Sequence, residues 1–242
     1  KTAFGISKRL NPENARDIFE ECNDKLKNDD SLTAWGLLKK YHVEVVCTTD
    51  DPIDDLRHHL KAKQTGISTK MLPTWRPDKA MAVENAENFR TYVEKLSAAS
   101  NVQIHHFQDF IDAIQQRHDF FNAVGCKLSD HGIERFYAEE YTDAEIHTSF
   151  DKVYGGKQLT SEEILKFKSA MLYIFAIQDE ASGWVQQYHY GALRNNNTRM
   201  FNLIGADTGF DSIGEFNTAS ECSKFFDRLD LNGHLAKTIL YN

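Results

Sequence analysis

Residues 184–200 read Trp-Val-Gln-Gln-Tyr-His-Tyr-Gly-Ala-Leu-Arg-Asn-Asn-Asn-Thr-Arg-Met, and this stretch decides the fold. Its first half, 184–190, is rich in aromatic and β-branched residues, which favours a buried strand. Its second half starts at a glycine and predicts a polar loop rather than a strand or a good helix. His189 lies where the strand meets the loop. In parallel α/β folds, ligands bind at that junction, because it lies at the carboxyl ends of the strands.

The loop after this strand carries donors that suit an anionic, hydroxyl-rich ligand. Arg194 can fork a carboxylate, and the amides of Asn195 and Asn196 can both donate and accept hydrogen bonds. The alternative interpretation is a capped surface loop with a histidine at the edge of the core. Because the donors follow one another directly after a buried strand, the sequence favours a ligand-binding loop.

Further strand-like runs accompany this one, and helices separate them. The strands are predicted at 43–47, 68–72, 126–128, 184–190 and 236–242. One or two helices lie between successive strands. This alternation favours an α/β fold with a parallel sheet and right-handed crossovers. An eight-stranded barrel and a doubly wound sheet both fit the order.

Local signals predict where the helices begin and end. Asn11 before Pro12, and Asp51 before Pro52, are typical of helix N-termini. Gly125 is typical of a helix C-terminus. The helices before it are predicted at 11–29, 31–41, from 52 onward, 84–98 and 104–122. Three capping boxes are predicted, formed by Thr142 with Glu145, Thr160 with Glu163, and Thr218 with Glu221.

The composition is that of an ordinary globular chain. The 242 residues are 41% hydrophobic and 26% charged, with a net charge of −8 and no basic run. Nucleic acid and anionic membranes are therefore poor candidate partners. No apolar stretch approaches the roughly 20 residues that span a bilayer, and the N-terminus has no signal-peptide pattern. The first residue is not Met, so we expect the chain to be an interior part of a longer polypeptide.

The cysteines and the paired histidines predict no metal site. Cys47 and Cys126 fall in strand-like runs and are predicted to be buried. The scattered thiols, with no CxxC, favour a reducing cytoplasm. The pairs 58–59 and 105–106 lie on predicted helices, where adjacent side chains point about 100° apart and cannot chelate one ion. They are predicted to be surface or boundary residues.

The residues that follow the predicted strands carry the candidate chemistry. Arg76 offers a cation for a carboxylate, Asp130 a carboxylate for proton transfer, and His189 an imidazole for a metal or a hydroxyl. Simpler roles are a structural ion pair for Arg76 and helix caps for Asp50, Asp51 and Asp130. The whole set is 48–51, then Trp75, Arg76, Asp78 and Lys79, then 129–131, and last His189 with Arg194 and the three asparagines.

Six motifs occur in order along the chain and together resemble the uronate isomerase (glucuronate isomerase) family of the amidohydrolase superfamily. They are CTTDDPID at 47–54, LPTWRPDKA at 72–80, GCKLSDH at 125–131, QYHYGALRNNN at 187–197, DTGFDSI at 207–213 and KTILYN at 237–242. The resemblance covers essentially the whole chain.

The resemblance implies a (β/α)₈ barrel of the TIM type, of which this chain would hold strands two to six. It implies interconversion of D-glucuronate with D-fructuronate and of D-galacturonate with D-tagaturonate. It also implies a divalent metal, usually zinc. Residues 1–41 would be a helical segment before strand two, and 42–242 the partial barrel, in one domain overall.

Individual residues match the family's site. Arg76 matches the arginine expected to hold the substrate carboxylate, and Trp75, Arg194, Asn195 and Asn196 join it as candidate substrate-binding residues. Asp130 and His189 match the active-site aspartate and the histidine near the metal. Whether His189 would ligate the metal or a sugar hydroxyl stays open.

The sequence also departs from the family's pattern. The HxH after the family's first strand and the Asp after its last strand are not in this sequence. We therefore expect this chain alone to bind metal weakly and to be inactive. The alternatives are a metal-dependent hydrolase of the same superfamily and a non-catalytic sugar-acid-binding module. The sequence leaves a homo-oligomer open.

Overall fold

The computed structural model describes residues 2–242. The chain forms two compact units, one of Lys1–Thr48 with Arg57–Leu72 and one of Thr49–Leu56 with Pro73–Asn242. Strands β1 (Val45–Asp50) and β2 (Lys70–Trp75) begin in the first unit and end in the second. The carboxyl ends of both strands, which carry the candidate chemistry, therefore belong to the second unit.

The first unit is mainly helical. The predicted helix at 11–29 starts later, because Asn11 accepts hydrogen bonds from the N–H groups of Glu13 and Asn14 and holds a turn instead. The prediction that Asn11 caps this helix is wrong. The predicted helix at 31–41 is split by a cap at Thr33, whose Oγ1 accepts from Gly36 N–H. The helical elements are α1 (Ala15–Asn28), η1 (Asp30–Leu32), α2 (Ala34–Lys40) and α3 (Arg57–Gln64).

Two predictions about side-chain burial in this unit are wrong. His59 is only 6% exposed, and its Nε2 lies 2.7 Å from Thr48 Oγ1. A hydroxyl partner within reach lets an imidazole be buried at low cost. Cys47 is exposed, although Cys126 is buried as predicted. Alternate residues of β1 are exposed, and Cys47 falls on the exposed side of the strand.

The strands of the main sheet follow one another in space as they do in the chain. The order is β1-β2-β3-β4-β7, with parallel pairing from β2 through β7. A doubly wound sheet would reverse direction partway across, whereas a barrel adds each strand on the same side. The order therefore selects barrel-type winding from the two folds that the sequence left open. The remaining strands are β3 (Leu128–Gly132), β4 (Val185–His189) and β7 (Thr238–Tyr241).

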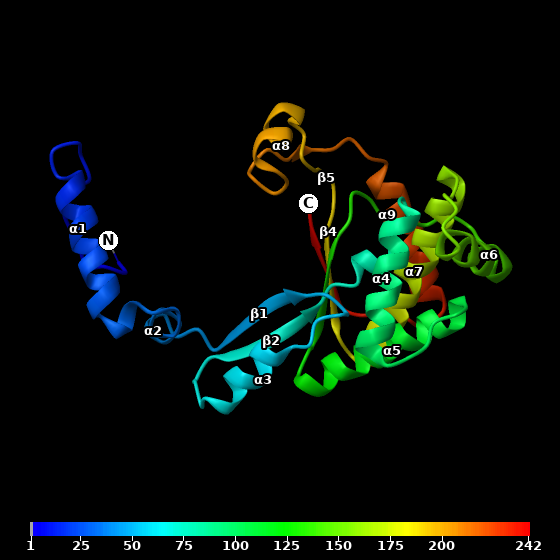
Figure 1. Cartoon of the computed structure of the whole chain (residues 1–242), viewed down its shortest axis with the longest axis horizontal. Coiled ribbons are helices and arrows are strands. Elements are labelled where there is room, and N and C mark those ends of the chain that lie inside the picture. Colours follow the sequence, from blue (N-terminus) through cyan, green and yellow to red (C-terminus); the bar gives the residue numbers. More distant parts are fainter. Residues whose placement is uncertain (1) are drawn as a thin grey trace. The chain divides into compact units, whose positions relative to one another are not determined.

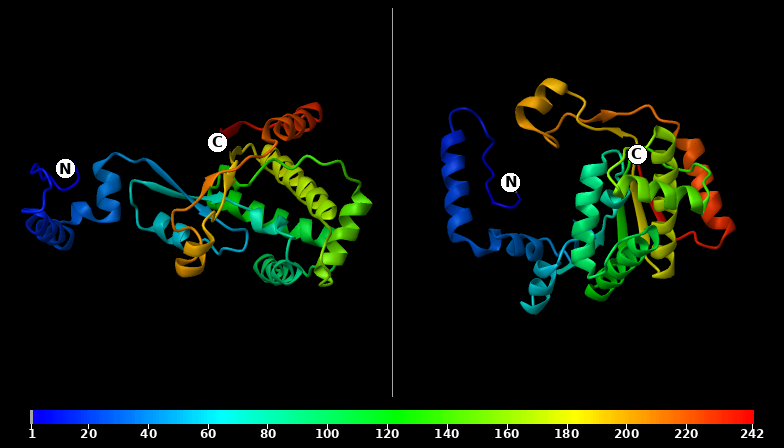
Figure 2. Two further views of the ribbon diagram at one scale, coloured as in Figure 1. Left: turned by 90° about the horizontal axis from the view of Figure 1, so that it is seen from above. Right: turned by 45° about the vertical axis from the view of Figure 1, so that its right-hand side comes forward.

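One face of this sheet packs against helices (Figure 1). Trp75 contacts Phe121 of α5, His131 lies against Phe175 of α7, and Tyr188 lies against Phe225 of α9. Figure 2 shows these helices from two further directions. The helical elements of the second unit, apart from α8, are η2 (Asp78–Met81), α4 (Ala86–Ser100), α5 (Phe107–Val124), α6 (Asp143–Tyr154), α7 (Ser161–Ala181) and α9 (Thr218–Leu231). None of the described helices is both long and apolar enough to cross a membrane.

In the second unit, most of the predicted start and stop signals of helices are confirmed. The capping boxes at Thr142 and Thr160 are confirmed, and Gly125 ends α5 with φ 119°. The box predicted at Thr218 is wrong, because Asn217 is the N-cap and the Thr218 hydroxyl donates to the Phe216 carbonyl.

The other face of the sheet is more open. Parallel strands alternate their side chains, so Gln187, His189, Ile239 and Tyr241 share this face. Ile239 is 44% exposed and Tyr241 42%. In a closed barrel this would be the interior face. β7 is the edge of this sheet, and Leu240 on its opposite face is likewise 44% exposed, which agrees with a barrel that these residues do not complete.

The polar stretch after β4 is more ordered than predicted. It forms two short antiparallel strands, β5 (Ala192–Leu193) and β6 (Ser212–Ile213), with α8 (Thr198–Ile204) between them. The expectation of an irregular loop is therefore wrong in part. Asn197 supplies the cap of α8 by accepting from Met200 N–H at 3.1 Å.

Candidate functional site

Arg76, Asp130 and His189 come together at the carboxyl ends of β2, β3 and β4. Arg76 follows β2 directly, Asp130 lies in β3, and His189 is the last residue of β4. The Nη2 of Arg76 is 2.5 Å from Oδ2 of Asp130, and its Nε–H donates to the Asp130 carbonyl at 3.0 Å. On the other side, Nε2 of His189 is 2.8 Å from Oδ1 of Asp130. The aspartate is thus the centre of a three-residue cluster.

The carboxylate of this cluster is buried, whereas the guanidinium and the imidazole beside it are partly exposed to solvent. The side chain of Asp130 is 9% exposed, whereas those of Arg76 and His189 are 37% and 43% exposed. A guanidinium supplies a permanent positive charge, and an imidazole and a carboxylate can each take up or give a proton. The arrangement can therefore hold an anion next to two groups that transfer protons.

The predicted strands near this cluster ended too early. The structure keeps Asp50, Asp130 and His131 inside strands, because the backbone pairing continues through them. Asp130 and His131 pair with β4, and the Asp50 carbonyl accepts from the Arg76 N–H at 2.9 Å. Asp130 and His131 are neighbours, so strand alternation points them to opposite faces. The prediction gathered both at one mouth, but only Asp130 joins Arg76 and His189.

A second pair lies behind the cluster. Nδ1 of His131 is 2.8 Å from Oδ1 of Asp78, and the Gly132 N–H donates to Oδ2 of Asp78 at 2.7 Å. Burial alone would raise the pKa of Asp78. The hydrogen bonds and charge of His131, the Gly132 N–H and the Arg76 charge outweigh it, so that the pKa lies below its ordinary value.

The end of β1 contributes weaker contacts. The Thr49 hydroxyl donates to Oδ2 of Asp130 at 3.4 Å. Asp51 accepts from the Tyr92 hydroxyl at 3.0 Å and pairs with Lys79 at 3.1 Å. The prediction that Asp51 caps a helix is wrong, because the next helix starts only at Arg57. Burial, together with the Asp51 charge, raises the pKa of Tyr92 well above its ordinary value.

Trp75 lies in the core. Its side chain is fully buried, with edge contacts to His118 at 5.3 Å and to Phe121 at 4.9 Å between ring centroids. It precedes Arg76 directly, and strand alternation sends the two side chains to opposite faces. Trp75 therefore anchors the end of β2 from behind.

Arg194, Asn195 and Asn196 bond within the β5–α8–β6 segment. Arg194 pairs with Asp211 at 2.6 Å, and the same carboxylate accepts the Asn195 N–H at 2.9 Å. The Asn196 amide donates to the Ser212 hydroxyl at 2.8 Å. These contacts tie the two ends of the segment together, and none of them reaches Asp130.

Tyr241 is a neighbour of the cluster that the sequence did not single out. Its ring stacks on the His189 ring with centroids 4.4 Å apart and planes 7° apart. The Tyr241 hydroxyl donates to Oε1 of Gln187 at 2.9 Å. The signal was the parallel register of β4 with β7, which pairs His189 with Tyr241 and follows only once the two strands are known to be neighbours.

The described residues do not make a metal site. No group of three or more His, Cys, Asp and Glu side chains among them lies close enough to hold an ion. Asp130 and His189 supply two donors, and both are engaged with each other. Zinc sites in proteins take three or four protein ligands, more than these two groups provide. The side chains present therefore do not fit a resident metal by themselves.

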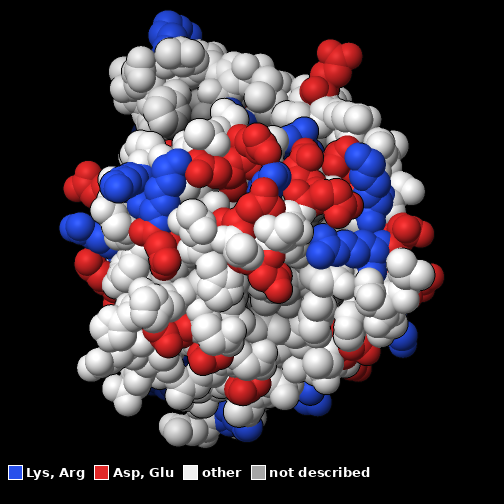
Figure 3. Space-filling model, turned by 90° about the vertical axis from the view of Figure 1, so that its right-hand side faces the viewer, with Lys and Arg blue, Asp and Glu red and all other residues white. Residues whose placement is uncertain are grey.

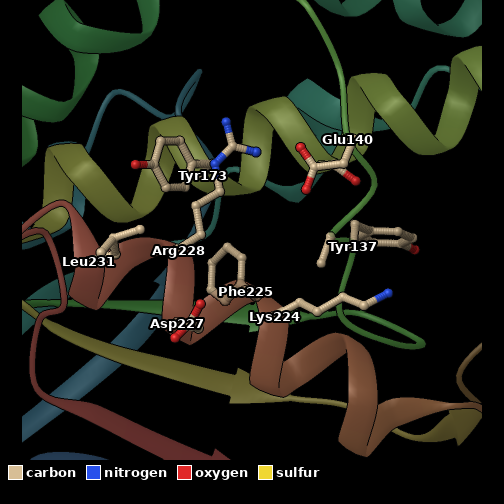
Figure 4. A pocket seen from close by; sticks show the side chains of 10 residues that line it. Tyr137, Glu140, Tyr173, Lys224, Phe225, Asp227, Arg228 and Leu231 are labelled. Atoms are coloured by element: carbon tan, nitrogen blue, oxygen red, sulfur yellow. The ribbon is translucent and has the colours of Figure 1, made fainter.

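Other surface features lie apart from the strand ends. A cavity of about 340 Å³ between α7, α9 and the segment after β3 is shown in Figure 4. In it the Arg228 guanidinium lies 4.3 Å from the Tyr173 ring centroid, so its charge is already engaged. The face in Figure 3 mixes acidic with basic side chains, and Asp and Glu gather in its upper part. That face offers no continuous basic surface for nucleic acid.

The winding of the sheet defines a protein of the (β/α)-barrel class, with a charged cluster at the carboxyl ends of its strands. The chain belongs to the glucuronate isomerase family, whose sequence model matches residues 1–242. The resemblance seen in the motifs is thereby confirmed.

Named relatives support the same assignment. The chain is 65% identical over 242 residues to a uronate isomerase of Bacteroides thetaiotaomicron, covering 100% of this chain and 52% of that protein. A uronate isomerase of Phocaeicola vulgatus is 64% identical over the same length, again with 52% of it covered. The chain thus spans about half the length of the curated relatives it matches.

Solved structures agree with the fold. The crystal structure of uronate isomerase from Thermotoga maritima superposes with a TM-score of 0.91 at 34% identity, covering 99% of this chain and 52% of that one. Glucuronate isomerase from Caulobacter crescentus gives 0.88 at 26% identity, with 99% and 49% covered.

Proposed function

We propose that the natural polypeptide containing this chain is an aldose–ketose isomerase. It interconverts D-glucuronate with D-fructuronate and D-galacturonate with D-tagaturonate. The contact of Arg76 and His189 with one aspartate at the strand ends is the observation that carries the proposal. Membership of the glucuronate isomerase family supports the choice of substrate.

Arg76 receives the carboxylate of the hexuronate in this proposal. Its Nε–H and one Nη2–H bond to Asp130, and a guanidinium has five N–H donors. Its remaining N–H groups donate to none of the described residues, and the side chain is 37% exposed. A bidentate carboxylate contact suits that free edge.

Asp130 and His189 carry the protons. Isomerisation moves the C2 proton of the aldose to C1, while O2 loses a proton and O1 gains one, through an enediol. Asp130 is proposed to move the carbon-bound proton, and His189 to move the proton between the two oxygens. The 2.8 Å distance between Nε2 of His189 and Oδ1 of Asp130 supports this division, because groups so close together suit adjacent atoms of one ligand.

The remaining predicted binding residues have weaker support. Trp75 would act by holding Arg76 in place from the core. The β5–α8–β6 segment is organised by the bonds of Arg194, Asn195 and Asn196. In the proposal these three residues contact a ligand when the segment covers the strand ends.

A divalent metal, zinc above all, belongs to the proposal as a cofactor of the natural polypeptide. His189 is the candidate ligand on this chain only as the alternative to its contact with a sugar hydroxyl, and the described residues do not supply a full ligand set with it. We expect this chain alone to bind zinc weakly. Calorimetric titration with zinc that gives tight one-to-one binding would contradict that expectation.

The proposal extends to setting and partners. The four scattered free cysteines suit a reducing cytoplasm. The partner is a small hexuronate rather than nucleic acid or membrane, as the net charge of −8 favours. A homo-oligomer stays open.

The test is turnover of D-glucuronate to D-fructuronate by the natural full-length polypeptide with zinc present. Arg76→Gln should raise KM strongly, whereas Arg90→Gln, an exposed arginine on α4 paired with Glu94, should leave turnover unchanged. Uronate binding without turnover would favour the sugar-acid-binding module. Failure to bind or convert any uronate would favour the hydrolase.

A further inference from the structure

Arg76 and Asp78, two residues apart in the chain, bind three consecutive residues of β3 between them. Arg76 bonds to the side chain and the carbonyl of Asp130. Asp78, two residues later, accepts from the Gly132 N–H at 2.7 Å and lies 2.8 Å from Nδ1 of His131. The loop after β2 is therefore fastened to β3 at consecutive positions by both of its charged side chains.

The backbone between Arg76 and Asp78 has little conformational freedom. Pro77 lies between the two charged residues, and its ring fixes its own φ at −86°. A Cβ built on Gly132 would lie 3.8 Å from both Nη2 of Arg76 and Oδ2 of Asp78. Both groups therefore lie beside Gly132, and the Arg76 charge is close enough to Asp78 to lower the pKa of its carboxyl.

His131 fixes the carboxylate from behind. Its ring is fully buried and stacks on Tyr188 at 4.9 Å, with Phe175 at 6.1 Å. A ring packed in this way cannot turn to follow a displaced partner. Because Asp78 is an acceptor, Nδ1 carries the proton in this bond. Asp78 is therefore held by two donors, one on a ring fixed by stacking and one on the backbone of β3.

We propose that Asp78 is a positioning residue for the ligand-binding guanidinium. Its carboxylate, held by His131 and Gly132, sets where Arg76 presents its free edge beside Asp130. It touches neither the substrate nor the reacting atoms. The inference rests on the proposed function of Arg76 and names the residue that fastens its loop to β3.

The test is Asp78→Asn in the natural full-length polypeptide, with D-glucuronate turnover and calorimetric D-glucuronate affinity both measured. An amide keeps the shape of the carboxylate but turns an N–H₂ toward one of the two donors, so one bond is lost. We expect KM and the dissociation constant to rise about ten-fold, the size of one lost charge-assisted hydrogen bond, with kcat changed less. Asp119→Asn, on an exposed turn of α5, is the matched control.

A second variant separates positioning from a loss of folding. His131→Phe keeps the buried ring but removes the Nδ1 donor, and it should raise KM in the same direction. The double variant should cost less than the sum of the two, because both act through one bond. Melting by circular dichroism reports whether each variant folds.

Each outcome decides the matter. An unchanged KM and affinity in folded Asp78→Asn, with wild-type turnover present, would overturn the positioning role and leave the proposed function intact. Equal losses that follow the melting temperature alone would overturn it as well. If the wild type binds uronate without turning it over, a ten-fold loss of affinity still supports the role. Neither binding nor turnover in the wild type would overturn both.

Discussion

The two faces of the parallel sheet are built from alternate residues of the same strands, and they differ sharply. On the helix-covered face, Ser129, His131 and Tyr188 have no exposed surface. On the open face, the His189 side chain at the end of β4 is 43% exposed. The edge strand β7 is exposed on both faces, with Ile239 and Leu240 each at 44%. The covered face holds the buried stack of His131 on Tyr188, whereas the open face holds the ion pairs of Asp130 at its carboxyl end, beside the partly exposed stack of His189 on Tyr241.

One set of strands therefore serves two purposes, stability on one face and chemistry on the other. The covered face buries apolar surface and so stabilises the fold. The open face keeps its charges reachable and contributes little burial. A residue and its neighbour along one strand, such as Asp130 and His131, can thus be changed with separate consequences for activity and for stability.

The largest effect is expected on the open face. Asp130→Asn removes the charge shared by Arg76 and His189 and should lower D-glucuronate turnover by the natural polypeptide by about 10²–10⁴-fold. Its melting temperature should change little. A variant that loses stability in proportion to its activity would break the comparison, because Asp130 would then be a structural residue.

The matching change on the covered face should act on stability. Tyr188→Ala removes a fully buried ring that contacts His131, Phe136 and Phe225, and should cost about 3–5 kcal/mol of unfolding free energy. Ile239→Ala, on the open face of the next strand, should cost below about 1 kcal/mol. Urea unfolding of the 242-residue chain measures both, and equal losses would contradict the division of the faces.

The helices that cover the sheet offer a smaller test. Thr142→Ala removes the confirmed cap of α6 and should cost about 1 kcal/mol. Thr218→Ala is the control, since Thr218 caps no helix, and should change stability by no more than about 0.5 kcal/mol. If the two variants unfold at the same urea concentration, capping does not contribute to the covering layer as argued.

Local signals made much of the covering layer predictable. The boxes at Thr142 and Thr160 need only residues three apart, and both formed. The same signal failed at Thr218, because Asn217 took the N-cap position and nothing in the pattern separates those cases. The predicted ends of the strands were wrong for a related reason. Asp130 and His131 look like loop residues until their distant partners are known.

The site was predictable only in part, because its contacts are long-range. Arg76, Asp130 and His189 could be gathered from the rule that parallel strands end at one edge. The bond of Asp78 with His131 joins residues 53 apart in the chain, and no local pattern marks it. The stacking of Tyr241 on His189 depends on which strand follows β4 in space. The bonds of Arg194 and Asn195 with Asp211 required the β5–β6 pairing.

The smallest expected effect on stability comes from an exposed charge at the start of α6, one of the helices of the covering layer. Hydrogen bonds from Lys166 and then from Thr142 lower the pKa of Glu145 to about 2, from an ordinary value of 4.5. A carboxylate whose folded pKa is depressed adds stability above its unfolded pKa and loses it as the pH falls through the folded value. The stability difference between wild type and Glu145→Gln should therefore be full above pH 4.5 and vanish near pH 2.

Urea unfolding at several pH values checks this window. Lys166→Gln should remove the larger part of the same pH dependence, because the Lys166 bond at 2.7 Å is the first cause of the depressed pKa. A difference that stays constant down to pH 2 would show that Glu145 acts through the shape of the capping box and not through its charge. The covering layer would then be stabilised by packing and capping alone, and charge would matter in this protein chiefly on the open face.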